Sequence, residues 1–255
     1  MNPDGSRLTR ITTDPGDDQS AWSPGASEIA FDRSRHGRQD VYVMRADGRG
    51  LRRLTSDGAS GSPTWSPDGA RIAFAREVPG NADIYVMDRD GARVTRLTRD
   101  PLLEYSPAWS PDGSRIAYVA CSKGAPPSPT RLYVMNADGS HRRTIGPRDP
   151  ASPSWSPDGT KIAFVNEDNG SVYVIGSRGS GLRRVVDVAS LPGGRHFPPN
   201  FTSRPVWSPD GRRILFAAGK IGSSHLYLVN LDGSGLVRLT HGAVEDEDPA
   251  WSRAR

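Results

Sequence analysis

The apolar residues of this chain occur in short runs of four to six positions, each bounded by Gly, Pro, Asp or Asn. Two consecutive examples, residues 115–119 and 132–135, are rich in β-branched and aromatic residues. Such runs are typical of buried strands, and the Pro-Asp-Gly and Asp-Gly segments between them favour tight turns. The pattern predicts an all-β protein.

The same set of four runs returns at a nearly fixed period. Each set begins with a Trp-Ser pair, and consecutive tryptophans are 43, 44, 46, 52 and 44 residues apart. Units of about 40–45 residues with four short strands are typical of β-propeller blades. We therefore predict a β-propeller of four-stranded blades and interpret the tryptophans as packing residues between blades. They are Trp22, Trp65, Trp109, Trp155, Trp207 and Trp251.

Counting the predicted strands indicates an unfinished ring. Five complete sets of four give 20 strands, and a lone fourth strand at 8–12 and a lone first strand at Trp251 bring the total to 22. Six blades would need 24, so we predict one propeller domain over residues 1–255, six-bladed, with five complete blades plus two strands of a sixth. We expect flanking sequence to be missing; the alternative is a native five-bladed ring with loose terminal strands.

Composition excludes several classes of function. The 33 basic and 29 acidic residues give a net charge of +4, but the charges are interspersed, which disfavours nucleic-acid binding. No apolar run approaches the roughly 18 residues of a membrane span, and the N-terminus lacks the apolar stretch of a secretory signal. A single cysteine excludes an internal disulfide and gives no indication of redox compartment. We expect a monomer.

The connections between strands differ in character. Turns after the first and third strands are short and uniform, whereas the other connections vary, including the predicted loops 33–40, 77–83 and 122–130 and the long connection 187–204. Binding residues favour varied loops on a rigid frame. We predict that a protein or peptide partner binds this variable face and the channel mouth. For the long connection, an ordinary insertion packed over the rim is the alternative, and the one that we favour. The candidate residues are Tyr105, Arg195, His196, Phe197 and Phe201.

Acidic residues precede several of the predicted first strands on the same face. Their oxygens could converge on Ca²⁺, which takes six to eight oxygen ligands. The alternative, which we favour, is a solvated acidic rim without any cofactor. The candidate ligands are Asp17, Asp18, Glu104, Glu245 and Asp246.

Motifs for catalysis are missing from the sequence. It has no Gly-x-Ser-x-Gly elbow, phosphate-binding glycine loop or His-Glu-x-x-His motif, so we predict no enzymatic activity. His36, His196, His225 and His241 fall on the variable face but on different blades. A metal-dependent propeller lyase or hydrolase is therefore an alternative without a convergent ligand set.

The repeats resemble those of the TolB β-propeller family. The resemblance rests on four Trp-Ser-Pro-Asp-Gly copies at 65–69, 109–113, 155–159 and 207–211, with recurring strands around them; the first copy, at 22–26, lacks the turn Asp. It implies a non-catalytic protein-interaction scaffold in the periplasm or outside the cell, with an envelope partner such as a peptidoglycan-associated lipoprotein. The family's separate N-terminal domain has no counterpart here.

Similar blades also form the non-catalytic propeller of prolyl-oligopeptidase-like enzymes. That resemblance implies the alternative that this chain is the propeller of a hydrolase whose catalytic domain lies outside it.

Overall fold

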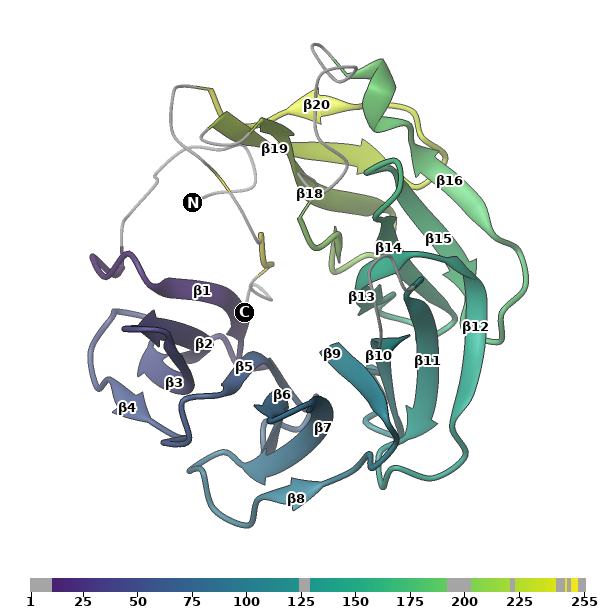
Figure 1. Ribbon diagram of the computed structural model, residues 1–255. Coiled ribbons are helices and arrows are strands. Elements are labelled where there is room, and N and C mark those ends of the chain that lie inside the picture. Colours follow the sequence, from purple (N-terminus) through teal and green to yellow (C-terminus); the bar gives the residue numbers. More distant parts are fainter. Residues whose placement is uncertain are drawn as a thin grey trace. The chain divides into compact units, whose positions relative to one another are not determined.

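A computed structural model of the chain describes residues 11–123, 129–191, 203–220, 223–241, 246 and 249–251. These residues form strands β1–β20 and a single 3-10 helix, Val188–Ser190 (Figure 1). The prediction of an all-β fold is confirmed. No helix in this part of the chain has the length and apolar character needed to cross a membrane.

The chain divides into two compact units, and each is described by itself. The described part of the N-terminal unit is residues 11–145, and that of the C-terminal unit begins at residue 146 and ends at Trp251. Both units are built from antiparallel groups of four strands in chain order, which confirms the four-stranded blades. The second and third groups are joined into one eight-stranded sheet by a single parallel pairing.

The N-terminal unit contains the first three blades. Blade 1 is β1 (Asp17–Trp22), β2 (Glu28–Arg35), β3 (Arg38–Arg45) and β4 (Arg52–Arg53). Blade 2 is β5 (Ser60–Trp65), β6 (Arg71–Val78), β7 (Asn81–Asp88) and β8 (Thr95–Arg96). Blade 3 is β9 (Leu102–Trp109), β10 (Arg115–Ser122), β11 (Arg131–Asn136) and β12 (Arg143–Arg148), and the two units divide within β12.

The C-terminal unit contains two further blades. Blade 4 is β13 (Pro150–Trp155), β14 (Lys161–Asn166), β15 (Val172–Gly176) and β16 (Arg183–Val186). Blade 5 is β17 (Val206–Trp207), β18 (Arg213–Lys220), β19 (Ser223–Asn230) and β20 (Val237–Arg238). Of the two lone strands predicted for a sixth blade, the described residues Ile11, Thr12 and Trp251 lie outside any strand, so a sixth blade stays a prediction.

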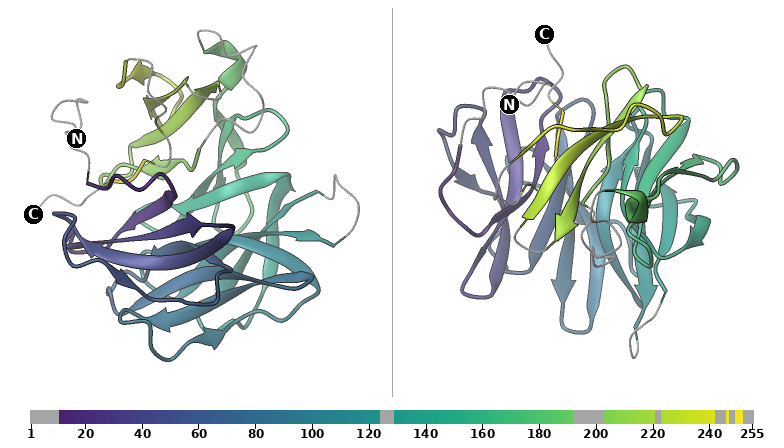
Figure 2. Two further views of the ribbon diagram at one scale, coloured as in Figure 1. Left: turned by 60° about the vertical axis from the view of Figure 1, so that its left-hand side comes forward. Right: turned by 90° about the horizontal axis from the view of Figure 1, so that it is seen from above.

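Neighbouring blades within a unit pack face to face. One face of blade 2 presents Trp65 and Phe74, and these contact the small side chains Ala30 and Val43 of blade 1. Figure 2 shows the purple strands of blade 1 stacked on the blue strands of blade 2. Trp109 packs in the same way against blade 2, and Trp207 against blade 4. Each fully buried Phe contributes about 1.5–3 kcal/mol to such a core.

The Trp-Ser-Pro-Asp-Gly turn is held by one buried serine. The Ser66 hydroxyl donates to Asp68 Oδ1 at 2.5 Å and accepts the N–H of Arg71 at 2.9 Å. Gly69 completes the turn with a φ of +69°, a conformation that costs glycine little. Blades 3, 4 and 5 repeat the serine–aspartate bond at Ser110–Asp112, Ser156–Asp158 and Ser208–Asp210.

The loops predicted at 33–40 and 77–83 are wrong, because the strands continue through them. β2 and β3 pair as far as Arg35 opposite Arg38, leaving only His36 and Gly37 in the turn. Both have a positive φ, +52° and +73°, as in the two-residue turns whose twist matches that of the strands. Residues 78 and 81 pair in the same way in blade 2.

Candidate functional site

The connections between blades and the β2–β3 and β6–β7 turns lie at one end of the N-terminal unit, because successive strands run in opposite directions. This loop end comprises residues 12–16, 36–37, 54–59, 79–80 and 97–101. The Trp-Ser-Pro-Asp-Gly turns lie at the opposite, turn end.

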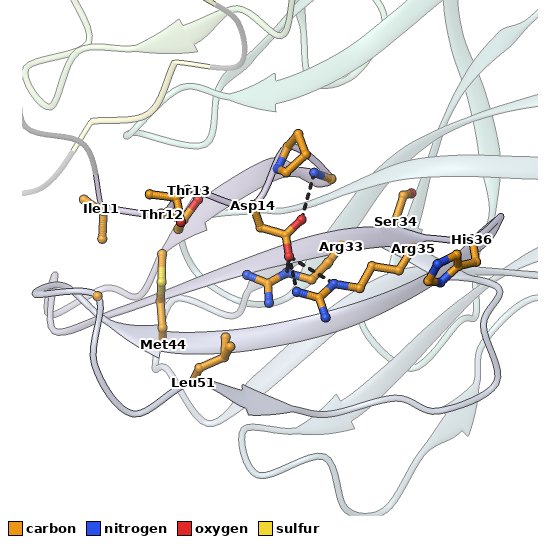
Figure 3. A pocket seen from close by; sticks show the side chains of 13 residues that line it. Ile11, Thr12, Thr13, Asp14, Arg33, Ser34, Arg35, His36, Met44 and Leu51 are labelled. Atoms are coloured by element: carbon orange, nitrogen blue, oxygen red, sulfur yellow. Dashed lines mark hydrogen bonds and ion pairs between the residues drawn. The ribbon is translucent and has the colours of Figure 1, made fainter.

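A groove of about 710 Å³ runs along blade 1 from the loop end towards the turn end (Figure 3). At its loop end Asp14 accepts a hydrogen bond of 3.0 Å from Arg35 Nε and lies 3.4 Å from Arg33 Nε. Further along, the groove is lined by Met44 and by Leu51, which is 46% exposed. The groove therefore combines an apolar wall with an arginine whose side chain is 61% exposed, Arg35.

Each blade of this unit carries an arginine over one or both of a pair of stacked aromatic rings. Arg33 lies 5.4 Å from the Phe31 ring and 5.1 Å from the Tyr42 ring. Arg76 covers Phe74 and Tyr85 in blade 2 at 5.3 and 4.7 Å. These contacts, each worth about 0.5–2 kcal/mol, fix the guanidinium groups beside the connections.

The arginine of blade 3 comes from a different strand. Ala120 stands where β2 and β6 have Arg33 and Arg76, and Arg142, just before β12, lies 4.8 Å from the Tyr133 ring. Arg142 is also paired with Asp100 and with Glu104, the latter at 3.1 Å. Three similar blades thus carry three different charge networks.

Two buried carboxyl groups meet between blades 2 and 3. Asp83 and Glu104 are both 0% exposed. Asp83 Oδ2 lies 2.7 Å from Arg96 Nη2. Burial is the largest cause of the rise in the pKa of Glu104 to about 7, and the charge of Asp83 acts in the same direction. A carboxyl group that titrates near neutral pH is a candidate functional group on physical grounds.

A family model described as the TolB beta propeller domain matches residues 55–185, which is just over half of the chain. The chain belongs to this family.

Solved structures of TolB proteins share the fold. The chain is 24% identical to TolB from Acinetobacter baumannii, with a TM-score of 0.80, and the match covers 98% of this chain and 61% of that one. A candidate TolB from Agrobacterium tumefaciens is 21% identical with a TM-score of 0.72, over 90% of this chain and 83% of that one. The chain therefore spans about three fifths of the length of the Acinetobacter protein.

A propeller enzyme also has a similar fold. An oligogalacturonate lyase in complex with manganese is 15% identical with a TM-score of 0.63, and the match covers 87% of this chain and 64% of that one. At these identities the likeness concerns the fold alone.

Of the predicted partner-binding residues, the structure describes only Tyr105. It lies in β9, is half-buried and packs against the core shared by blades 2 and 3, and burial raises the pKa of its hydroxyl. Arg195, His196, Phe197 and Phe201 lie outside the described residues.

The predicted calcium ligands lie within strands rather than before them in three cases. Asp17 and Asp18 belong to β1 and Glu104 to β9. Asp17 is paired with Arg33, and Glu104 Oε1 accepts a hydrogen bond from Arg142, so both side chains already have an arginine partner. Asp246 is half-buried and its N–H donates to Ser224, while Glu245 lies outside the described residues. Among described residues no three His, Cys, Asp or Glu side chains form a metal-binding group.

Sequence reasoning missed the partners of Glu104. Asp83, Arg96 and Arg142 are 21, 8 and 38 positions away from it, so no local motif joins them. One feature of the sequence could have indicated Arg142: the other repeats have an apolar residue at the equivalent position. The equivalent residues are Leu51, Val94, Leu182 and Leu236, all of which are exposed.

Proposed function

We propose that this chain is a non-catalytic interaction scaffold that binds a protein or peptide partner at its loop end. The observation that carries the proposal is the contrast between the two ends of the blades. At the turn end the same serine–aspartate bond repeats in four blades, whereas at the loop end blades 1, 2 and 3 each have a different charge network. The repeated turns serve folding, whereas residues that differ from blade to blade on a rigid frame favour partner recognition, here at the loop end.

The groove along blade 1 suits an extended segment of a partner. Its apolar wall, formed in part by Ile11 and Leu51, is exposed, and Arg35 stands at its loop end. Exposed aliphatic surface beside an arginine is a combination that protein interfaces use for packing and orientation. Membership of the TolB family supports a protein partner, and with it a location in the periplasm or outside the cell.

Affinity capture with matched variants tests the proposal. The immobilised protein is compared with Arg35→Glu at the loop end and with Arg89→Glu, an arginine of similar side-chain exposure (61% and 58%) at the turn end. We expect Arg35→Glu to weaken capture of a specific partner at least tenfold and Arg89→Glu to leave it unchanged. Equal capture by wild type and both variants would contradict binding at the loop end.

The long connection provides a second arm of the same experiment. Replacement of Arg195, Phe197 and Phe201 by alanine should weaken capture if that segment belongs to the binding surface. Capture that is lost in this triple variant but retained in Arg35→Glu would place the partner on the long connection instead of the groove.

A further inference from the structure

Strand pairing brings Asp83 and Glu104 together although they come from different blades. Ala82 of β7 pairs in parallel with Leu103 of β9, so the next residue of each strand is a carboxylic acid at the same level. Both side chains are completely buried. Two ionised carboxylates so placed would repel each other and would each lose hydration.

Each carboxyl group has one oxygen engaged and one without a partner. Asp83 Oδ2 accepts from Asn81 Nδ2 at 3.0 Å and from Arg96, and Glu104 Oε1 accepts from Arg142 Nη1 at 3.1 Å. Asp83 Oδ1 and Glu104 Oε2 have no hydrogen-bond partner among the described residues. Buried acceptors without a donor are costly, and a proton on one of these two oxygens would supply the missing donor.

Blades 1 and 2 show how the same junction is built without a second acid. There Gln39 pairs in parallel with Ala59, which places Asp40 beside Ser60. Asp40 Oδ1 accepts the Thr55 hydroxyl at 3.1 Å and the Gly58 N–H at 3.0 Å. In the next junction Glu104 stands where the first has Ser60, and the corresponding Asp83 Oδ1 has no donor among the described residues.

The pair has two cationic neighbours. Arg96 of β8 is paired with Asp83, and Arg142, which precedes β12, is paired with Glu104 and with Asp100, whose side chain is 45% exposed. Tyr118 of β10 is buried and has a raised pKa, so it is neutral.

We propose that Asp83 and Glu104 share one proton at neutral pH, carried on Glu104 Oε2 and donated to Asp83 Oδ1. This shared proton stabilises the contact between blades 2 and 3, and the stabilisation depends on pH. The pKa of about 7 that burial gives Glu104 agrees with this arrangement. As the pH rises the proton leaves to solvent, and the junction then holds two adjacent charged carboxylates. Because Tyr105 follows Glu104, the loop end of blade 3 loosens with it.

The direction of the pH effect follows from linkage. The pKa of Glu104 is higher in the folded protein than its ordinary value of 4.5, so its contribution to stability is complete below pH 4.5. It declines as the pH rises towards 7 and changes no further above that. A shift of this size corresponds to a change of up to about 300-fold in the unfolding equilibrium constant.

The test combines a direct titration with matched variants. Carboxyl carbons of the wild-type chain are followed by ¹³C NMR, and unfolding by urea is measured from pH 5 to 8.5 for wild type, Glu104→Gln and Glu77→Gln, an exposed glutamate of β6. We expect a carboxyl signal with a midpoint near pH 7 that is absent from Glu104→Gln. We also expect wild type and Glu77→Gln to lose stability with rising pH, and Glu104→Gln to lose much less.

The proposal is overturned if the carboxyl signal of Glu104 has its midpoint at pH 4.5 or below. It is also overturned if the stability of Glu104→Gln depends on pH as that of the wild type does. The titration of the wild-type chain decides the question even if Glu104→Gln fails to fold. Neither measurement involves a partner, so the outcome is independent of the proposed interaction function.

Discussion

Ala26 occupies the turn position that Gly69 holds in the next blade, and both residues have a positive φ, +51° at Ala26 and +69° at Gly69. Their N–H groups make the same bond, to the carbonyl of Ser23 and of Ser66 respectively. An L-residue with a side chain in this region costs about 1–2 kcal/mol, a cost that glycine avoids. The first turn of the chain is therefore less favourable than the other four.

Rewriting this turn as Trp-Ser-Pro-Asp-Gly should stabilise the protein. In Gly25→Asp/Ala26→Gly the glycine relieves the left-handed conformation, and the new aspartate can accept the Ser23 hydroxyl as Asp68 accepts that of Ser66. A side chain at residue 25 meets no atom within 4 Å. We expect a gain of about 1–2 kcal/mol and a rise of about 2–8 °C in Tm, measured by calorimetry. An unchanged or lower Tm would show that the turn is not strained.

Two glycines with similar φ values should respond differently to alanine. Gly139, at +87°, would place a Cβ 2.7 Å from the Leu97 carbonyl oxygen of the preceding blade, whereas Gly80, at +74°, would place it in open space. We expect Gly80→Ala to cost about 1 kcal/mol from backbone strain alone. Gly139→Ala should cost about 3 kcal/mol because it also pushes two blades apart. Equal losses in urea unfolding would contradict this close packing of turn against blade.

The fold could be predicted from the sequence because every blade repeats the same local chemistry. Strand ends were less certain. β4 ends at Arg53, because two residues later the Thr55 side chain accepts the Val41 N–H at 2.9 Å. The hairpins were missed because the outer parts of β2 and β6 are polar, so alternation of apolar residues stops before the strands do.

The candidate site was accessible to sequence analysis only in part. Glu104 was singled out, but for calcium, because its role depends on Asp83 in another blade and on Arg142 at the far end of its own. The contact with Asp83 depends on a single parallel pairing between β7 and β9, and the pattern of apolar and polar residues carries no information about it.

The buried serine of the repeated turn should matter most above pH 3.8. The Ser110 hydroxyl holds the pKa of Asp112 at about 2, helped by the Ser114 N–H. Because this pKa is lower than the ordinary 3.8, the bond stabilises the fold above pH 3.8 and its contribution is lost as the pH falls towards 2. Ser110→Ala should cost about 1–2 kcal/mol at pH 7 and move the midpoint of acid unfolding to higher pH. Asp112→Asn serves as the control, since it should reduce the acid dependence without emptying the serine site.

The variants Arg142→Leu and Leu51→Arg compare the same exchange of residue type at two equivalent positions. Arg142 belongs to the charge network of Glu104, whereas Leu51 is exposed. Arg142→Leu installs the residue type found at Leu51, but it removes the cation from Glu104 and from the Tyr133 ring. At pH 8 we expect a loss of about 3 kcal/mol, because an unpaired buried carboxylate is costly. At pH 5.5 the loss should fall to about 1 kcal/mol, because Glu104 is then protonated in both proteins. Leu51→Arg, at an exposed site, should change stability by no more than about 0.5 kcal/mol at either pH. A loss for Arg142→Leu that is equal at the two pH values would mean that Arg142 stabilises the blade through Tyr133 and not through the charge of Glu104.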